Sequence, residues 1–295
     1  MRTTKLPHIL VVVFSCILNA CVTPEMYNGE DPGPDPTPGD NKKGALAVSP
    51  DWSNRSMNVP TPSQFIVSLN NNEYKATFGS GQTDFPDSIK VGNYNLQLYN
   101  EASQIQVSHS TASVDGVSGG GIYASPGWFF GAYQAIEIKA EEKTQVTPIM
   151  RQLVKQLTIT INVEDGGMPR ILTAAGTLSG VASAVDFSST PGLLKSPASV
   201  SFSFTKNDEL NQLIGVVRLM GVIGSEQNLQ VNLTLVNGTT WEPFVSDMSS
   251  ALSNFNNDMI TPQELTNTIS LGVNPDVSGF IHDWEEAFDN ITIKY

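Results

Sequence analysis

Cysteine is nearly absent from this sequence of 295 residues, which contains only Cys16 and Cys21. Both lie near the amino terminus, so neither can cross-link the rest of the chain. If the first 20 residues are removed as a signal peptide, Cys16 leaves with them and Cys21 has no partner. We therefore expect no disulfide and no thiol chemistry in the mature protein. Its fold must depend on a hydrophobic core, which a chain of this length can bury.

Basic residues are scarce as well. The chain carries 16 Lys and Arg against 29 Asp and Glu, a formal net charge of −13. Arg2 and Lys5 belong to the first 20 residues, so the remainder is more acidic still. Proteins bind nucleic acids by neutralising phosphates with Lys and Arg, and this balance therefore argues against a nucleic-acid partner. It also disfavours adhesion to an anionic surface by charge alone.

Long hydrophobic runs are missing beyond the amino terminus, where no segment approaches the ~18 apolar residues of a membrane span. The one pronounced run covers residues 9–18, is too short to span a bilayer, and follows Arg2 and Lys5. Leu-Asn-Ala-Cys closes it at Cys21. A basic segment, an apolar segment and a cleavage site directly before a cysteine are typical of a bacterial lipoprotein signal.

This motif predicts a signal peptide over residues 1–20 and a lipid on Cys21, with a thioether to diacylglycerol and acyl chains such as palmitate. The protein would then be held at the outer membrane by lipid, with its body in solvent. An ordinary secretory signal peptide is the alternative. Residues 21–44 follow as a Pro- and Gly-rich tether. Such linkers extend by about 3.1 Å per residue, so this one can hold the body away from the bilayer.

Motifs that carry catalysis or bind metals are also lacking. Beyond the signal segment only two histidines remain, His109 and His282, and they lie far apart in the sequence. The sequence has no HExxH, paired CxxC, GxSxG or GxxxxGK[ST] pattern. An acidic cluster lies near the carboxyl terminus, and its residues are Asp283, Glu285, Glu286 and Asp289. A solvated face is the favoured interpretation of that cluster. We expect no enzyme, no cofactor and no metal site.

What the sequence does contain is a hydrophobic period of two. Residues 157–163 read Leu-Thr-Ile-Thr-Ile-Asn-Val, and residues 229–235 repeat the alternation. Residues 200–204 and 291–295 follow it too. Strands of this kind place one face on a core and the other in water, as in antiparallel β-sandwiches. Asn237-Gly238 predicts a tight turn after the second of these segments. The fold class is therefore all-β.

Pro148 interrupts the pattern and suggests a domain boundary. We expect two tandem β-sandwich domains, over residues 45–147 and 148–295. The run from 150 to 163 predicts one long first strand of the second domain. Residues 171–190 are rich in Ala, Ser, Gly and Thr, and their pattern predicts no element.

Aromatic residues gather in one place, at Trp128-Phe129-Phe130, whereas Trp52, Trp241 and Trp284 are isolated. Core packing is the favoured interpretation of the cluster. The alternative is an exposed platform for sugars, because Trp and Tyr combine a flat apolar face with a polar edge.

Several segments resemble the fimbrillin-associated anchor and minor-subunit lipoproteins of Bacteroidetes fimbriae. Beside Cys21 and its tether, they are residues 48–52 (Val-Ser-Pro-Asp-Trp), 91–101, 148–161 and 175–181. The resemblance implies two transthyretin-like β-sandwich domains and a role in attaching or terminating a fimbrium. It also implies strand addition between subunits, and no catalytic residues. The candidates for an exchanged or groove-forming strand are Ile291, Ile293 and Tyr295.

Two functions are therefore weighed. The first is a fimbrial anchor or minor structural subunit, tethered to the outer membrane, exposed on the cell surface and joined to fimbrillin-type pilus subunits in support of cell adhesion. The alternative is a glycan-binding surface lipoprotein of a polysaccharide-uptake system. The first needs an open sheet edge or groove that accepts a strand. The second needs aromatic side chains exposed together on one face.

Overall fold

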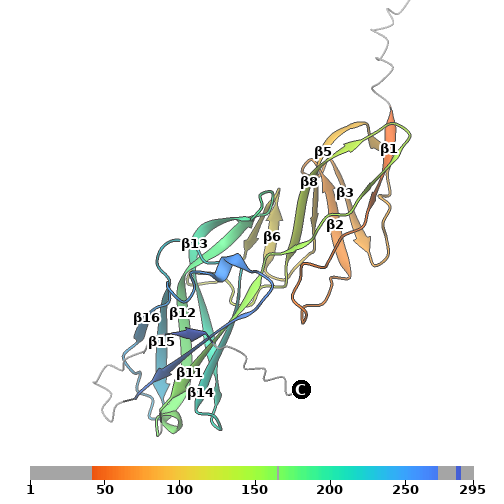
Figure 1. Cartoon of the computed structure of the whole chain (residues 1–295). Coiled ribbons are helices and arrows are strands. Elements are labelled where there is room, and N and C mark those ends of the chain that lie inside the picture. Colours follow the sequence, from red (N-terminus) through yellow and green to blue (C-terminus); the bar gives the residue numbers. More distant parts are fainter. Residues whose placement is uncertain (1–41, 165, 272–283, 287–295) are drawn as a thin grey trace, which may run out of the picture. The chain divides into compact units, whose positions relative to one another are not determined.

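The computed structural model describes residues 42–164, 166–271 and 284–286 (Figure 1). Regular structure in these residues is almost entirely strand, and the two 3-10 helices, η1 (Met168–Arg170) and η2 (Phe255–Asn257), are single turns. The all-β fold class predicted from the period of two is confirmed. This part of the chain contains no helix with the length and apolar character needed to cross a membrane.

Two sheets form the N-terminal sandwich. The smaller has the order β4 (Ile89–Lys90), β1 (Lys43–Val48), β9 (Lys143–Val146), and the larger the order β10 (Arg151–Gln152), β8 (Phe130–Ile138), β5 (Gly92–Tyr99), β2 (Gln64–Leu69), β3 (Tyr74–Gly79). Strands β1 and β9 run parallel. Apolar side chains of both sheets, such as Val48, Val67 and Leu98, meet in one buried cluster. That shared core holds the two sheets together.

The remaining strands form one larger sheet, called here the C-terminal sheet. Its order is β16 (Phe244–Asp247), β15 (Asn228–Leu235), β12 (Ile171–Asp186), β13 (Leu193–Asn207), β14 (Gln212–Leu219), β11 (Lys155–Val163), β17 (Gln263–Ile269), β18 (Glu285–Glu286). A hairpin of β6 (Ile105–Ser108) and β7 (Thr111–Val114) joins it through pairing of β7 with β12. Strand β17 runs parallel to β11, and the other pairs are antiparallel.

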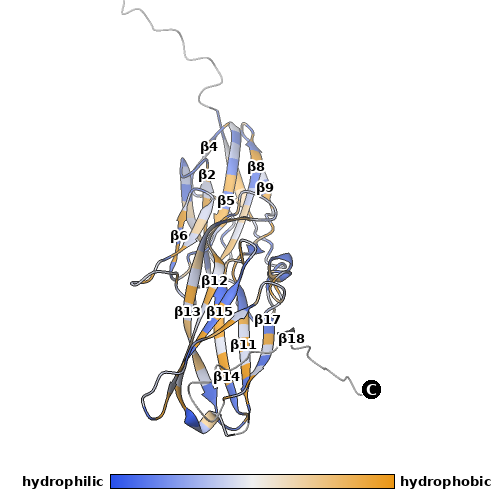
Figure 2. Ribbon diagram, turned by 90° about the vertical axis from the view of Figure 1, so that its left-hand side faces the viewer, coloured by the Kyte–Doolittle hydropathy of each residue, from blue (hydrophilic) through white to orange (hydrophobic). Residues whose placement is uncertain are grey.

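Alternation is clearest where the sequence predicts it. Every second residue of β11 is buried, beginning with Lys155, and β15 buries Leu229, Val231 and its later odd residues. Figure 2 shows hydrophobic and hydrophilic bands along the strands. The turn at Asn237-Gly238 also forms, with Gly238 at a φ of 83°, a left-handed value that glycine adopts without strain. These strand predictions are confirmed.

The run from 150 to 163 is not one strand, and that prediction is wrong. Arg151 and Gln152 form β10 and pair with β8 of the N-terminal sandwich. Strand β11 begins at Lys155 and belongs to the C-terminal sheet. Between them, the Leu153 amide donates to the Phe129 carbonyl at 2.9 Å. Residues 152–155 are buried although Gln152 and Lys155 are polar, so neither burial nor hydrophobicity marks the change of sheet.

The segment without a predicted element is the longest strand. Strand β12 lies between β13 and β15, and its small residues leave room for large ones on β13. A Cβ built on Gly176 would lie 2.6 Å from the Phe202 ring, and one on Gly215 would lie 2.5 Å from it. Phe202 therefore covers glycines on the strands at both sides. The glycines are an aid to packing here, although glycine weakens most strands.

Two features bear on the predicted boundary at residue 148, which stays a prediction. The β6–β7 hairpin precedes it yet joins the C-terminal sheet. Strands β2 and β5 are also buried on both faces near this junction. Phe65 packs into the N-terminal core, while Ile66 and Tyr99 pack into the cluster that contains Leu157. At this end of the sheet, both faces of β2 and β5 are therefore buried, and neither face is exposed to solvent.

Candidate functional site

The residues that carry the predicted attachment chemistry lie outside the described part of the chain. They are Cys21, Ile291, Ile293 and Tyr295. Lipidation of Cys21 and strand exchange by the last residues stay predictions. Strand β18 nevertheless pairs antiparallel with β17, through Glu286 to Leu265 and Glu285 to Thr266.

The remaining titratable candidates form no visible site. His109 lies in the turn between β6 and β7 at a φ of 54°, and its Nδ1 is 3.2 Å from the Ser108 hydroxyl. His282, Asp283 and Asp289 are not among the described residues. Within the described ranges, no three His, Cys, Asp or Glu side chains gather as metal ligands.

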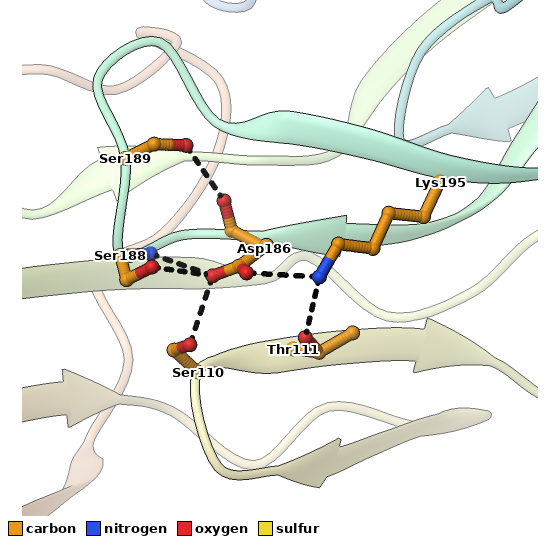
Figure 3. A network of polar contacts seen from close by, with 6 residues as sticks. All are labelled: Ser110, Thr111, Asp186, Ser188, Ser189 and Lys195. Carbon is orange, nitrogen blue, oxygen red and sulfur yellow. Dashed lines mark hydrogen bonds and ion pairs between the residues drawn. The ribbon is translucent and has the colours of Figure 1, made fainter.

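One cluster of polar side chains forms a hydrogen-bonded network, around Asp186 at the end of β12 (Figure 3). Its carboxylate accepts hydrogen bonds from the Ser110 hydroxyl at 2.8 Å, the Ser188 hydroxyl at 2.7 Å and the Lys195 ammonium at 2.9 Å. Lys195 also donates to the Thr111 hydroxyl at 3.4 Å. These contacts tie the β6–β7 hairpin to β12 and β13.

Burial alone would raise the pKa of Asp186, but hydrogen bonds from Lys195, Ser188 and Ser110 outweigh it and hold the pKa below its usual range. An acid that stays ionised, with its oxygens already engaged, is poorly suited to donate or abstract a proton. The cluster therefore serves to hold the β6–β7 hairpin against β12 and β13.

Replacing Asp186 with asparagine should lower the free energy of unfolding by about 1–3 kcal/mol at pH 7, because it removes a charged hydrogen-bond acceptor. The lowered pKa means that this stability is present above the unfolded pKa of about 4 and is lost as pH falls further. Urea unfolding between pH 7 and 3 tests this. Asp208→Asn is the matched control, because Asp208 pairs with Lys206 while largely exposed. An Asp186 effect unchanged at pH 3 would contradict the assignment.

The tryptophans do not form a common exposed face. Trp241 is fully buried, and Trp52, Trp128 and Trp284 are half-buried. Trp52 packs edge-on against Phe130, with ring centroids 5.5 Å apart. The Trp284 indole donates to the Ser246 hydroxyl at 2.8 Å. Core packing of Phe129 and Phe130, the favoured interpretation of that cluster, is confirmed.

A surface pocket of about 490 Å³ opens beside Trp128. Its apolar lining comes from Pro60, Pro62, Phe65 and Ile66, together with Trp128. The prolines belong to the segment that leads into β2, while Trp128 directly precedes the residues that enter β8. Of these residues, only the tryptophan belongs to the aromatic cluster visible in the sequence. The other residues are distant in the chain, and no local pattern indicates that they meet.

Sheet edges are the second candidate feature. Within the described ranges, β3 pairs only with β2, β6 only with β7, and β16 only with β15. Each therefore has a row of backbone groups with no strand beside it in this part of the chain. Such an edge can accept a further strand. The edge of β3 is the longest of the three, at six residues.

Comparison with known proteins gives a result for structure alone. No protein-family model matches the chain, and no curated protein sequence matches it. Several solved structures, however, match the chain. The fimbrial anchor protein Mfa2 from Porphyromonas gingivalis matches with a TM-score of 0.59 at 12% identity, over 83% of this chain and 97% of that one.

Two Bacteroides structures extend the comparison. A candidate adhesin from Bacteroides ovatus has a TM-score of 0.57 at 14% identity, covering 80% of this chain and 91% of its own. A candidate polysaccharide-binding protein from Bacteroides thetaiotaomicron has a TM-score of 0.55 at 9% identity, covering 83% and 99%. The resemblance to fimbrial proteins predicted from the sequence is thus confirmed as a likeness of fold: this chain has the fold of these three Bacteroidetes proteins.

Proposed function

We propose that this chain is a fimbrial anchor or minor structural subunit that supports cell adhesion. The lipid on Cys21 would hold it in the outer membrane, with its body exposed on the cell surface, and strand addition would join it to fimbrillin-type subunits. We further propose that it acts structurally and not as an enzyme. In support, the Asp186 cluster is engaged in internal hydrogen bonds.

The observation that carries the proposal is the match in fold to a fimbrial anchor protein over 83% of this chain and 97% of that one. A match of that extent covers both parts of the described fold. The lipoprotein motif at Cys21, read independently from the sequence, supplies the means of attachment that an anchor requires.

Strand addition has physical support in the edges of the sheets. In β-augmentation, main-chain hydrogen bonds provide affinity and side-chain pockets provide specificity. Strand β3 offers unpaired main-chain groups within the described ranges. Near the carboxyl terminus, β18 pairs with β17, and β18 ends at Glu286, five positions before Ile291 in the sequence. This chain can therefore be a strand acceptor, a strand donor or both.

The alternative, a glycan-binding lipoprotein of an uptake system, has weaker support. Its requirement of several aromatic side chains exposed on one face is not met by the described tryptophans, of which Trp241 is buried and the others half-buried. The match to a candidate polysaccharide-binding protein keeps sugar binding open as an additional property.

Deletion of the gene tests the anchor function. Fimbriae should detach into the medium, or change in length, because their base has lost its attachment. Electron microscopy of cells and of the culture supernatant measures both. Restoring the wild-type gene should return the fimbriae to the cells. Attached fimbriae of normal length in the deletion strain would reject the proposal.

A further inference from the structure

The pocket beside Trp128 has a polar rim whose side chains face solvent. Thr61, Ser63, Gln64, Thr77 and Glu101 all line it and are exposed. Among the described residues, none of these five side chains makes a hydrogen bond or ion pair. They come from the segment before β2, from β2 itself, from β3 and from the second residue after the end of β5. Hydroxyl, amide and carboxylate groups thus line one pocket, where a ligand could replace the water that hydrates them.

The aromatic wall of the pocket is held in place by the surrounding structure. Asn100 donates to the Trp128 carbonyl at 2.9 Å and accepts from the Phe130 amide at 2.7 Å. The Arg218 guanidinium lies over the indole, 5.2 Å from its centroid, and donates to the Ser125 carbonyl at 3.0 Å. The ring is therefore fixed before a ligand arrives, which lowers the entropic cost of binding.

The charge of the lining selects the class of ligand. Among the described residues that line this pocket, Glu101 alone is charged. The neighbouring smaller pocket shares Ile66, Asn100 and Glu101 with it and adds one cation, Lys75. A phosphate or an acidic polymer would need several cations, so the lining excludes those ligands.

The backbone at the pocket argues against an extended peptide. Phe65 pairs with Phe78 and Ile66 pairs with Thr77, so the β2 and β3 backbones here face each other. A peptide in the pocket would meet side-chain groups in place of a ladder of main-chain donors and acceptors. Strand addition would instead take place along the outer edge of β3.

We propose that this pocket binds a neutral oligosaccharide. A sugar ring presents C–H groups that pack against Trp128 and the two prolines, and hydroxyl groups that bond to amides, hydroxyls and a carboxylate. A few fixed polar groups on an apolar wall are typical of small-ligand sites. The inference goes beyond anchoring, because it gives the protein a second attachment, to a glycan.

Titration calorimetry of the whole mature protein with maltohexaose, mannohexaose, xylohexaose and chitohexaose tests the proposal. We expect at least one of the four to bind with a Kd on the order of 10⁻⁴ M. Trp128→Ala should weaken that binding by at least about tenfold, and so should the rim variant Gln64→Ala/Glu101→Ala. The rim variant leaves the core intact, since both side chains are exposed. Glu137→Ala is the matched control, on an exposed residue outside the pocket, and should bind as wild type does.

Three results would overturn the assignment: no binding of any of the four sugars, binding that the rim variant leaves unchanged, or preferential binding of a proline-rich hexapeptide. None of these measurements depends on fimbriae. Failure here would leave the anchor function standing, and failure of the deletion experiment would leave the pocket standing.

Discussion

Trp241→Ala will lower the free energy of unfolding by about 3–5 kcal/mol, because truncation of a large buried aromatic loses its burial and leaves a cavity. Trp241 is among the largest fully buried side chains, in the cluster that holds the C-terminal sheet together. The Arg170 guanidinium lies 5.4 Å from the ring centroid and covers it. A loss of this size is a large share of the 5–15 kcal/mol by which domains are stable. Urea unfolding followed by circular dichroism measures it.

Trp241→Phe separates packing from hydrogen bonding. The Trp241 indole nitrogen has no hydrogen-bond partner among the described residues. Phenylalanine therefore gives up no hydrogen bond and loses only part of the volume, so its cost should be about 1–2 kcal/mol. Val245→Ala, at an exposed position of β16, should change stability by less than about 0.5 kcal/mol. If phenylalanine costs as much as alanine, the indole nitrogen has a partner after all.

Cys21→Ala should move nearly all of the protein from the membrane fraction to the soluble fraction. Each buried methylene of an acyl chain contributes about 0.8 kcal/mol, and two chains suffice for stable anchoring. Without the thiol there is no thioether and no diacylglycerol. The fold should not change, because Cys21 belongs to none of the described strands, the first of which is β1 (Lys43–Val48). Detergent phase separation and metabolic labelling with palmitate measure the two effects.

Cys16→Ala is the control for this experiment. Cys16 lies inside the segment that signal cleavage removes, so its loss should leave both membrane retention and labelling intact. Retention of the Cys21→Ala protein in the membrane would show that something other than the lipid holds it, and would remove the basis of the proposed anchor.

The sequence predicts this fold best where one face of a strand is exposed to solvent. Strands β11 and β15 alternate cleanly because their outer residues, such as Thr158 and Asn232, remain partly exposed. The period then reports burial directly. The fold class, and the turn at Asn237-Gly238, follow from these segments alone.

Prediction fails where a partner decides the structure. Strand β12 is built from small residues because Phe202 fills the space above Gly176, and that complementarity is visible only once β13 lies beside it. The run from Met150 to Val163 changes sheets between Gln152 and Lys155, two polar residues that are both buried, so its pattern gives no sign of the change. The candidate pocket shows the same limit, since Thr77 and Glu101 line it together with Trp128 only through the pairing of β3 with β2, β2 with β5 and β5 with β8.

The parallel pairs have a consequence for when the protein can fold. Leu157 of β11 pairs with Gln263 of β17, more than 100 residues later in the chain, and Ala45 of β1 pairs with Lys143 of β9. Contacts this distant in sequence form slowly, because the chain loses the entropy of a long loop before it gains the contact. The C-terminal sheet therefore cannot be completed until β17 has been synthesised. A chain that stopped before Gln263 would leave the Leu-Thr-Ile-Thr-Ile edge of β11 unpaired, and such an edge promotes aggregation.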